Sequence, residues 1–505
     1  MHYDHDPKFP DGFFWGASSA AWQTEGATEE GGRTPAIIDL NSQTKAPYAD
    51  NSIASDHYHH MHEDVQLMAE CGFTSYRFSI SWSRIIPASD GKVNERGIAF
   101  YNSLIDELKA HNIEPIVTLY HYDMPVWVDE ELGGWKYRGI IDAFDHYVRV
   151  CFERFGDRVK YWLAINEQNM QICYGDWLGV SKGCDDWFRD KWRVNHIMNL
   201  CHAKAVNACH ELVPGGKIGP VPGMVPIYPF SSEPMDQIAA MNAEEFTEKI
   251  WNDTDVYGEY SEFLKNYWKN NNIDPGIEPG DEELMKSAKI DFIAVNCYRS
   301  NTAKWAPADM QSHSYDMNKT GEKGKLVFPV VPGQYQLCYN PFVPYTDWDW
   351  EIDPVSMRYV MRYLWDHYHL PMMVTENGYG AHEHKDANGE IHDQYRIDFL
   401  RDTIYQLGLA IEDGCKIIGY NPWSFLDLLS TGNGIEKRYG LVYVDATDEE
   451  LVKAKKKGVL PPMKRIKKDS YYWYSKLIKS NGKEWGIDMK DHAEPVNTAH
   501  RKESE

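Results

Sequence analysis

Short apolar runs that lack alternation recur along this chain, and amphipathic stretches separate them. The run at residues 372–375, MMVT, follows Pro371 and ends at Glu376. An apolar run of this kind is typical of a strand that is buried on both faces. Seven further segments have a strand-like pattern: residues 11–18, 74–80, 116–120, 161–165, 217–223, 292–295 and 417–420.

Apolar residues at helical spacing mark stretches between these runs. Asn94 is a predicted cap for a helix whose apolar face runs from Ile98 to Leu108. Similar patterns cover residues 61–72, 144–155 and 194–212. Strands that alternate with helices predict an α/β fold with a parallel sheet, and eight such units predict a closed (β/α)8 barrel, the TIM barrel, with long βα loops.

Three regions fall outside this alternation. Residues 301–347 and the Lys-rich residues 445–468 are predicted to be long loops, and residues 453–457 within the second are expected to be a solvated loop. The polar tail from about residue 480 is expected to fray. We expect residues 1–505 to form a single barrel domain, because length alone does not divide such a fold.

The net charge and the cysteine content limit which cellular compartment and which binding partners suit this sequence. The net charge of −24 argues against nucleic acid and anionic membranes as partners. No run of 18 apolar residues exists, and the polar start MHYDHDPKFP lacks the apolar core of a signal peptide. Nine cysteines are scattered without a CxxC motif, with Cys201 and Cys209 on predicted core faces. We therefore expect a cytoplasmic protein with buried free thiols.

Polar or aromatic residues stand where most of the predicted strands end. In a TIM barrel the carboxyl ends of the strands meet on one rim, where function gathers. A single such residue means little, and an isolated Glu at a strand end is more often an ion-pair partner. Six on one rim are hard to explain by packing alone: Arg77, His121, Glu167, Asn296, Glu376 and Trp423.

Glu167 and Glu376 are the two carboxylates on this predicted rim. Hydrolysis of a glycosidic bond needs two carboxyl groups that flank the bond. One protonates the leaving oxygen, and the other attacks the anomeric carbon or activates water. The pair therefore makes glycoside hydrolysis the leading chemical hypothesis.

Six segments, in order along the chain, resemble the motifs of glycoside hydrolase family 1. They are WGASSAAWQTEGA, YRFSISWSRIIP, TLYHYDMP, AINEQ, VTENG and KRYGLVYVD. The resemblance implies a TIM barrel and a retaining mechanism that needs neither metal nor cofactor. It implies that Glu167 is the acid/base and Glu376 the nucleophile. Gln168 departs from the family, which usually has proline after the acid/base.

The same resemblance assigns roles to further residues. Arg77 and Tyr298 would orient the nucleophile and favour its ionised form. Trp350 would lie on the aglycone side. The glycone would be bound by Gln23, His121, Asn166 and Trp423, although a tryptophan taken alone is more often a core residue.

The segment after the eighth strand favours a phosphorylated substrate. Family members that act on neutral sugars usually have Glu-Trp where this chain has Ser430-Thr431. Ser430, Lys437 and Tyr439 resemble the phosphate-binding set of the family's 6-phosphoglycosidases. A phosphate carries about −1.5 to −2 charges at pH 7, so a lysine and hydroxyl donors suit it and a carboxylate would repel it. Alone, this lysine would more often belong to a surface turn.

The leading hypothesis is a retaining 6-phospho-β-glucosidase that acts on cellobiose 6-phosphate or on aryl β-glucoside 6-phosphates. Thr431 favours the gluco form, whereas the spacing of Ser430 and Lys437 resembles the galacto type, so a 6-phospho-β-galactosidase stays open. Two competing hypotheses are a β-glucosidase for neutral sugars and a non-catalytic sugar-phosphate binding protein. A homo-oligomer also stays open.

One cluster resembles a metal site but is not expected to be one. Its members are Asp56, His57, His59, His60, His62 and Asp64. A helix would spread these side chains over several faces. We expect a solvated helix face with one or two capping contacts.

Overall fold

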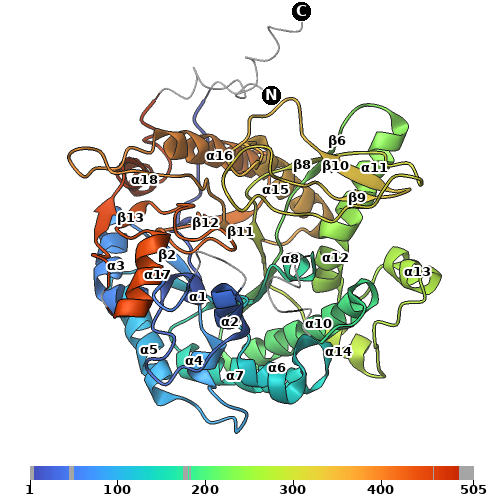
Figure 1. Ribbon diagram of the computed structural model, residues 1–505, viewed down its shortest axis with the longest axis horizontal. Coiled ribbons are helices and arrows are strands. Elements are labelled where there is room, and N and C mark those ends of the chain that lie inside the picture. The colour runs from blue at the N-terminus through green and yellow to red at the C-terminus, as the bar shows by residue number, and fades with distance from the viewer. Residues whose placement is uncertain (1–4, 45–49, 174–179, 181–182, 459, 488–505) are drawn as a thin grey trace, which may run out of the picture.

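A ring of parallel strands lies at the centre of the computed structural model, which describes residues 5–44, 50–173, 180, 183–458 and 460–487 (Figure 1). Each strand overlaps one of the eight predicted runs, so those predictions are confirmed. The eight are β1 (Phe14–Trp15), β2 (Ser75–Ser79), β3 (Glu114–Tyr120), β4 (Tyr161–Asn166), β5 (Lys217–Val221), β7 (Ile293–Asn296), β11 (Met372–Glu376) and β12 (Ile417–Tyr420).

Backbone hydrogen bonds close the ring from two half-sheets. One half has the order β2-β3-β4-β5 and the other has the order β1-β12-β11-β7. Thr74 N donates to Trp15 O at 2.7 Å, which joins β1 to β2. Asp291 N donates to Ile218 O at 2.9 Å, which joins β5 to β7. The fold is therefore the predicted (β/α)8 barrel.

Side chains on the strands alternate between two hydrophobic clusters. On β3, Ile116 belongs to the small cluster inside the barrel, whereas Val117 and Leu119 belong to the large cluster under the helices. Both faces of each strand are thus buried, which explains why the sequence shows continuous apolar runs. The inner cluster consists of Ile116, Leu163, Val221, Phe292, Ala294 and Met373.

Helices surround the barrel (Figure 1). The long ones are α3 (His57–Cys71), α5 (Glu95–Ala110), α7 (Gly139–Phe155), α10 (Trp187–Leu212), α15 (Val355–Tyr368), α16 (Gln394–Glu412) and α18 (Asp469–Lys479). The first four confirm the predicted helices. Asn94 occupies the predicted cap position of α5, but its Nδ2 donates to Gly31 O and Arg84 O and does not cap the helix.

Shorter helices lie in the loops that connect strands and helices. They are α1 (Ala21–Thr24), α2 (Ile37–Thr44), α4 (Trp82–Ile85), α6 (Val126–Leu132), η1 (Gly134–Lys136), α8 (Gln168–Cys173), α11 (Pro234–Glu244), η2 (Glu245–Lys249), α12 (Ile250–Tyr257), α13 (Glu262–Asn270) and α14 (Asp281–Ser287).

The prediction of a long loop at residues 301–347 is wrong. This region contains β8 (Asn301–Lys304), β9 (Val330–Val331) and β10 (Tyr335–Cys338). They form a second sheet with β6 (Ile227–Pro229), in the order β6-β8-β10-β9, and α11 packs on it (Figure 1). The strands have two to four residues, and β6 comes from a distant part of the chain, so no periodic pattern marks them.

The prediction of a loop at residues 445–468 is also wrong. The region contains α17 (Asp448–Lys457) and β14 (Arg465–Lys467), which pairs with β13 (Val442–Val444). Thr447 and Glu450 form a capping box at the start of α17, a signal that the lysine-rich composition concealed. Lys455 contacts Asp50 at 2.9 Å, so this lysine belongs to an ion-paired helix face.

Three other expectations concern the chain as a whole. All nine cysteines are free, and six of them are buried. None of the helices in the described ranges combines the length and the apolar content that a membrane span requires. The tail prediction falls mainly on residues 488–505, which lie outside the described part of the chain.

Candidate active site

A cavity of about 640 Å³ opens at the carboxyl ends of the barrel strands. Two of the predicted site residues, Arg77 and Asn166, are not among its lining residues but bond to Glu376 and Asn296, which line it. The other predicted site residues all line this one cavity: Gln23, His121, Glu167, Tyr298, Trp350, Glu376, Trp423, Ser430, Lys437 and Tyr439.

Glu376 is the last residue of β11 and is only 4% exposed. Arg77 Nη1 donates to Glu376 Oε1 at 2.6 Å, and Tyr298 Oη donates to Oε2 at 2.7 Å. Burial raises the pKa of Glu376, while the Arg77 charge and the Tyr298 hydroxyl hold that rise down. Both carboxylate oxygens are thereby held by donors that offset part of the effect of burial on the ionised form.

Glu167 directly follows β4 and faces the same cavity. Asn296 Nδ2 donates to Glu167 Oε1 at 3.1 Å, and the Tyr122 hydroxyl donates to Oε2. Burial and the neighbouring Glu376 charge raise the pKa of Glu167 to about 7. Within the described ranges no lysine or arginine donates to Glu167, so Glu167 is the member of the pair whose environment favours the protonated form.

Asn166 has a fixed amide orientation. Its Oδ1 accepts from Arg77 Nη2 at 2.6 Å and from Asn296 Nδ2 at 3.1 Å. Its Nδ2 lies 3.4 Å from His121 Nε2 and 3.3 Å from the Tyr122 hydroxyl. The amide therefore presents a donor towards the cavity side occupied by His121 and Tyr122.

An aromatic wall stands beside these polar groups. The rings of His121 and Trp423 stack with centroids 5.8 Å apart and planes at 17°. Trp423 is 5% exposed, so it is a core residue that also lines the cavity. Burial and the Arg77 charge lower the pKa of His121 well below its usual value, so its imidazole is neutral. Gln23 Nε2 donates to Leu429 O at 2.5 Å, which fixes its amide.

Lys437 is a buried lysine whose amine lies near three aromatic rings. It is only 2% exposed, and its Nζ lies 3.9 Å from the ring centroid of Trp350, 5.0 Å from that of Trp348 and 5.6 Å from that of Tyr439. Burial and the Arg299 charge lower the pKa of Lys437 well below its usual value. Among the described residues, no carboxylate forms an ion pair with it. Such a site favours an anionic ligand, because a buried charge needs a partner.

Ser430 and Tyr439 complete this group. Ser430, Thr431 and Tyr439 line the same cavity as Lys437. Trp350, the predicted aglycone residue, also packs against Tyr298 with ring centroids 5.6 Å apart. It therefore lies between Tyr298, which donates to Glu376, and the buried Lys437.

Some residues of the site have no role in the predicted set. Tyr122 and Asn296 hold Glu167. Asn296 is on the predicted rim without an assigned role, whereas Tyr122 lies two residues beyond the end of β3 and is not part of any prediction. Arg299 adds a second cation near Lys437. Trp348 covers Lys437 from a distant loop, and no sequence pattern marks it.

The histidine-rich start of α3 is only partly the solvated face that we expected. His57 and Asp64 are buried, with His57 Nδ1 and Asp64 Oδ2 2.7 Å apart, and Arg465 Nε donates to Asp64 at 2.8 Å. The remaining histidines pair with carboxylates at or near the surface. Asp56 occupies the cap position but makes no side-chain capping bond.

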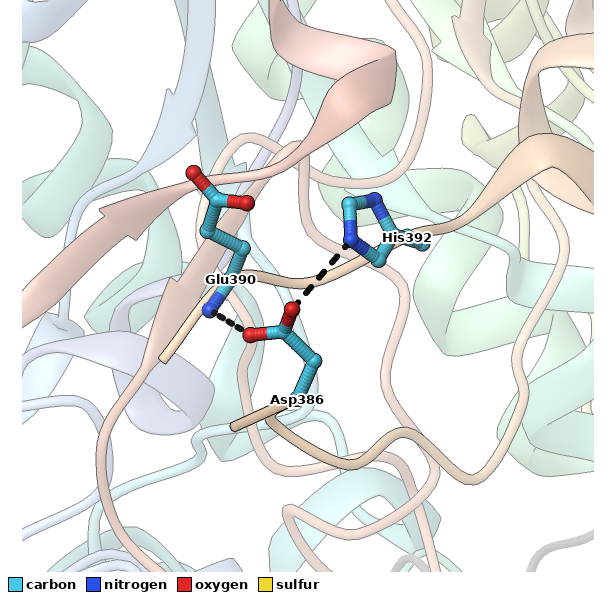
Figure 2. Close-up of side chains that lie close together, drawn as sticks. All are labelled: Asp386, Glu390 and His392. Atoms are coloured by element: carbon cyan, nitrogen blue, oxygen red, sulfur yellow. Dashed lines mark hydrogen bonds and ion pairs between the residues drawn. The ribbon is translucent and has the colours of Figure 1, made fainter. Parts of the chain in front are cut away.

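A second group of potential metal ligands lies on an exposed loop, where Asp386, Glu390 and His392 come close together (Figure 2). Asp386 Oδ1 already accepts from the backbone N–H groups of Asn388 and Glu390, each at 2.8 Å. This arrangement is that of a self-capped turn.

Comparisons with known proteins agree with these features. The family model described as Glycosyl hydrolase family 1 matches residues 5–483. An aryl-phospho-beta-D-glucosidase, BglC of Bacillus subtilis (strain 168), is 44% identical over 488 residues, which cover 95% of this chain and 99% of the relative. A 6-phospho-beta-glucosidase of Dickeya chrysanthemi is 36% identical, with 94% and 98% covered. The solved structure of a family 1 b-glucosidase from Thermotoga maritima has a TM-score of 0.81 and 33% identity, with 95% and 100% covered.

Proposed function

Since this chain belongs to glycosyl hydrolase family 1, we propose that it is a retaining 6-phospho-β-glucosidase. Its substrates are β-glucosides phosphorylated at O6, such as cellobiose 6-phosphate or aryl β-glucoside 6-phosphates. The names of two relatives, an aryl-phospho-beta-D-glucosidase and a 6-phospho-beta-glucosidase, support this substrate class.

In the first step, Glu376 attacks the anomeric carbon and Glu167 protonates the leaving oxygen. The contacts of Glu376 with Arg77 and Tyr298 support its role as an ionised nucleophile. The pKa of Glu167, raised to about 7 by burial and by Glu376, supports its role as the acid. A covalent glycosyl-enzyme results.

In the second step, water hydrolyses the glycosyl-enzyme. Glu376 is now esterified and no longer charged, so the neighbouring charge that raised the pKa of Glu167 is gone. Glu167 has given up its proton and can act as the base that activates the water. Asn166 presents Nδ2 towards the sugar, where we place the 2-hydroxyl, and His121, Gln23 and Trp423 bind the rest of the glycone.

Lys437 carries the proposal of a phosphorylated substrate. It is buried under Trp348, Trp350 and Tyr439, and no carboxylate of the described chain pairs with it. A 6-phosphate brings about −1.5 to −2 charges to such a lysine and accepts hydrogen bonds from Ser430 and Tyr439. A glutamate at position 430, usual for neutral sugars, would repel the phosphate.

The test compares three substrates: the 4-nitrophenyl β-glucoside 6-phosphate, its unphosphorylated form and the β-galactoside 6-phosphate. Preference for the phosphorylated glucoside by about a hundredfold or more in kcat/KM is the expected result. Preference for the galactoside would keep the phosphate site and overturn the assignment based on Thr431. Preference for the neutral sugar would overturn the phosphate site itself.

Glu376→Ala separates catalysis from mere binding. All turnover should vanish, because the variant lacks the nucleophile, while binding of glucose 6-phosphate should persist. An inactive wild-type protein that still binds the sugar phosphate would instead support a non-catalytic binding protein.

The proposal includes the cellular setting. The enzyme acts in the cytoplasm as a single catalytic domain without a cofactor, and nine free cysteines suit that reducing compartment. Sedimentation of the purified chain would show whether it forms a homo-oligomer.

A further inference from the structure

Gln168 follows the acid/base residue at the start of α8 and is the one position where the motif departs from the family. Proline there would restrain the backbone through its ring. Gln168 lacks this restraint, yet it follows a residue in a strained conformation, since Glu167 has φ +44°. Something else must hold this turn in place.

The side chain of Gln168 is bonded to helix α10. Gln168 Nε2 donates to Asn195 Oδ1 at 2.7 Å and to Asn199 Oδ1 at 2.6 Å. Both asparagines are buried. The two hydrogens of one amide nitrogen thus tie the start of α8 to the neighbouring long helix.

A buried chain of hydrogen bonds continues from Asn199. Asn199 Nδ2 donates to the Tyr260 hydroxyl at 3.0 Å, which lies 2.7 Å from His196 Nδ1. His196 Nε2 lies 2.8 Å from Asp281 Oδ2. Asp281 also accepts from both terminal nitrogens of Arg138, at 2.6 and 2.9 Å.

If His196 is neutral, every hydrogen bond in this series is donated in the same direction, from Gln168 towards Asp281. Tyr260 then donates to Nδ1, and Nε2–H donates to Asp281. Burial lowers the pKa of His196, which favours this neutral form although Asp281 opposes it. Burial raises the pKa of Asp281, but Arg138 and His196 bring it down to about 2, so the chain ends on a carboxylate. Every link is satisfied, and a satisfied network is rigid.

We propose that Gln168 is a positioning residue for the acid/base, and that the buried chain through Asn199, Tyr260, His196 and Asp281 holds it. The proposal rests on the proposed glycosidase function. Gln168 acts through the backbone of Glu167, whose N–H donates to Val221 O at 2.7 Å and whose carbonyl accepts from Gln171 N at 2.9 Å. Loss of the anchor shifts the carboxyl group relative to the leaving oxygen, and a misplacement of about 1 Å can cost on the order of 100-fold in rate.

The test uses two phosphorylated substrates with different leaving groups. Phenyl β-glucoside 6-phosphate needs protonation of its leaving oxygen, whereas the 2,4-dinitrophenyl compound does not, because its phenolate is stable. Gln168→Met keeps the length of the side chain and removes both donors. We expect kcat/KM to fall about tenfold or more for the phenyl substrate and to stay within about twofold for the dinitrophenyl substrate.

Equal losses on the two substrates would overturn the proposal, because a merely structural role lowers both alike. Tyr260→Phe breaks the chain farther from the site and should give the same selectivity, with about a threefold loss on the phenyl substrate. If Gln168→Met does not fold, Tyr260→Phe tests the proposal instead. Equal losses of kcat/KM on the two substrates in that variant would overturn it.

Asn207→Ala provides the matched control. Asn207 lies on α10 like Asn195 and Asn199, but it is partly exposed and its Nδ2 donates to Ser287. Both substrates should be unaffected. Wild-type protein that cleaves neither phosphorylated substrate would refute the proposed function, whereas an active wild type with a non-selective Gln168→Met refutes only the positioning role.

Discussion

Replacing Lys437 by methionine tests the phosphate site most directly. Methionine keeps the apolar part of the side chain between Trp350 and Trp348 and removes the charge. A hydrogen bond to a charged group is worth about 1.5–3 kcal/mol. At about 1.4 kcal/mol per factor of ten, kcat/KM for the phosphorylated glucoside should fall about 10- to 150-fold.

The loss should appear mainly in KM. The 6-phosphate takes no part in bond breaking, so Lys437 contacts it equally in the ground state and the transition state. The unphosphorylated glucoside makes no such contact, and its kcat/KM should change by less than about threefold. The assay is steady-state hydrolysis of the two 4-nitrophenyl glycosides by wild type and variant.

Lys437→Met should make the folded protein more stable, although it lowers activity on the phosphorylated glucoside. In the unfolded chain the pKa of Lys437 is about 10.4. In the free folded enzyme, burial and the Arg299 charge lower the pKa of Lys437 well below that value. Between these two pKa values the unfolded state binds more protons, so folding is penalised at neutral pH and less so as pH rises. Lys437→Met removes the penalty and should raise Tm at pH 7, with a gain that shrinks towards pH 10.

Lys385→Met is the matched control, because Lys385 already pairs with Asp445 at 2.5 Å and does not line the cavity. Inorganic phosphate should raise the Tm of wild type and of this control, but not that of Lys437→Met. Equal losses of kcat/KM on phosphorylated and neutral glucosides in Lys437→Met would refute the reasoning.

Three further predictions concern the carboxylates. Tyr298→Phe removes a donor from Glu376, so the pKa of Glu376 should rise and the acidic limb of the kcat/KM profile should move to higher pH; an unmoved limb would argue against this contact. Tyr122→Phe removes a donor from Glu167, so the alkaline limb should move to higher pH in the same assay. Arg396→Met removes the 2.6 Å contact with buried Glu383 and should cost about 3–5 kcal/mol in urea unfolding. Burial raises the pKa of Glu383 but Arg396 and Lys468 lower it to about 2, so this stability should be present above about pH 4.3 and lost as pH falls towards 2.

The barrel could be predicted because its strands are buried on both faces. Strand β1 has only two residues, but it lies inside a predicted run because residues before and after its paired segment are also buried. The second sheet could not be predicted in this way. Its strands β8, β9 and β10 have partners set by tertiary packing against α11 and β6, and short strands carry no period of their own.

The site residues also fall into two groups, those that the sequence could locate and those whose surroundings it could not predict. Residues at strand ends, such as Glu167 and Glu376, are placed by the barrel itself, so motif and topology locate them together. The burial of Lys437 could not be predicted from KRY, because lysine in such a segment is usually exposed. Its aromatic cover comes from Trp348 and Trp350, which are distant in sequence.

Charged residues that do not line the cavity hold the segment that contains Ser430 and Lys437. At one end of their segment, Asp427 accepts from Lys468 Nζ at 2.7 Å and from Arg438 Nη1 at 2.9 Å. Arg438 directly follows Lys437, so this ion pair holds the lysine's backbone while its side chain stays with the aromatic rings.

A second anchor lies between Ser430 and Lys437. Asp448, the first residue of α17, is buried and accepts from the backbone N–H of Ile435 at 2.9 Å. Carboxylates therefore bind the neighbours of Lys437 on both sides, while none pairs with Lys437 itself among the described residues. In a protein with a net charge of −24, this separation leaves the Lys437 amine for an anionic ligand, and neutralising Asp427 should disturb Lys437 although Asp427 does not line the cavity.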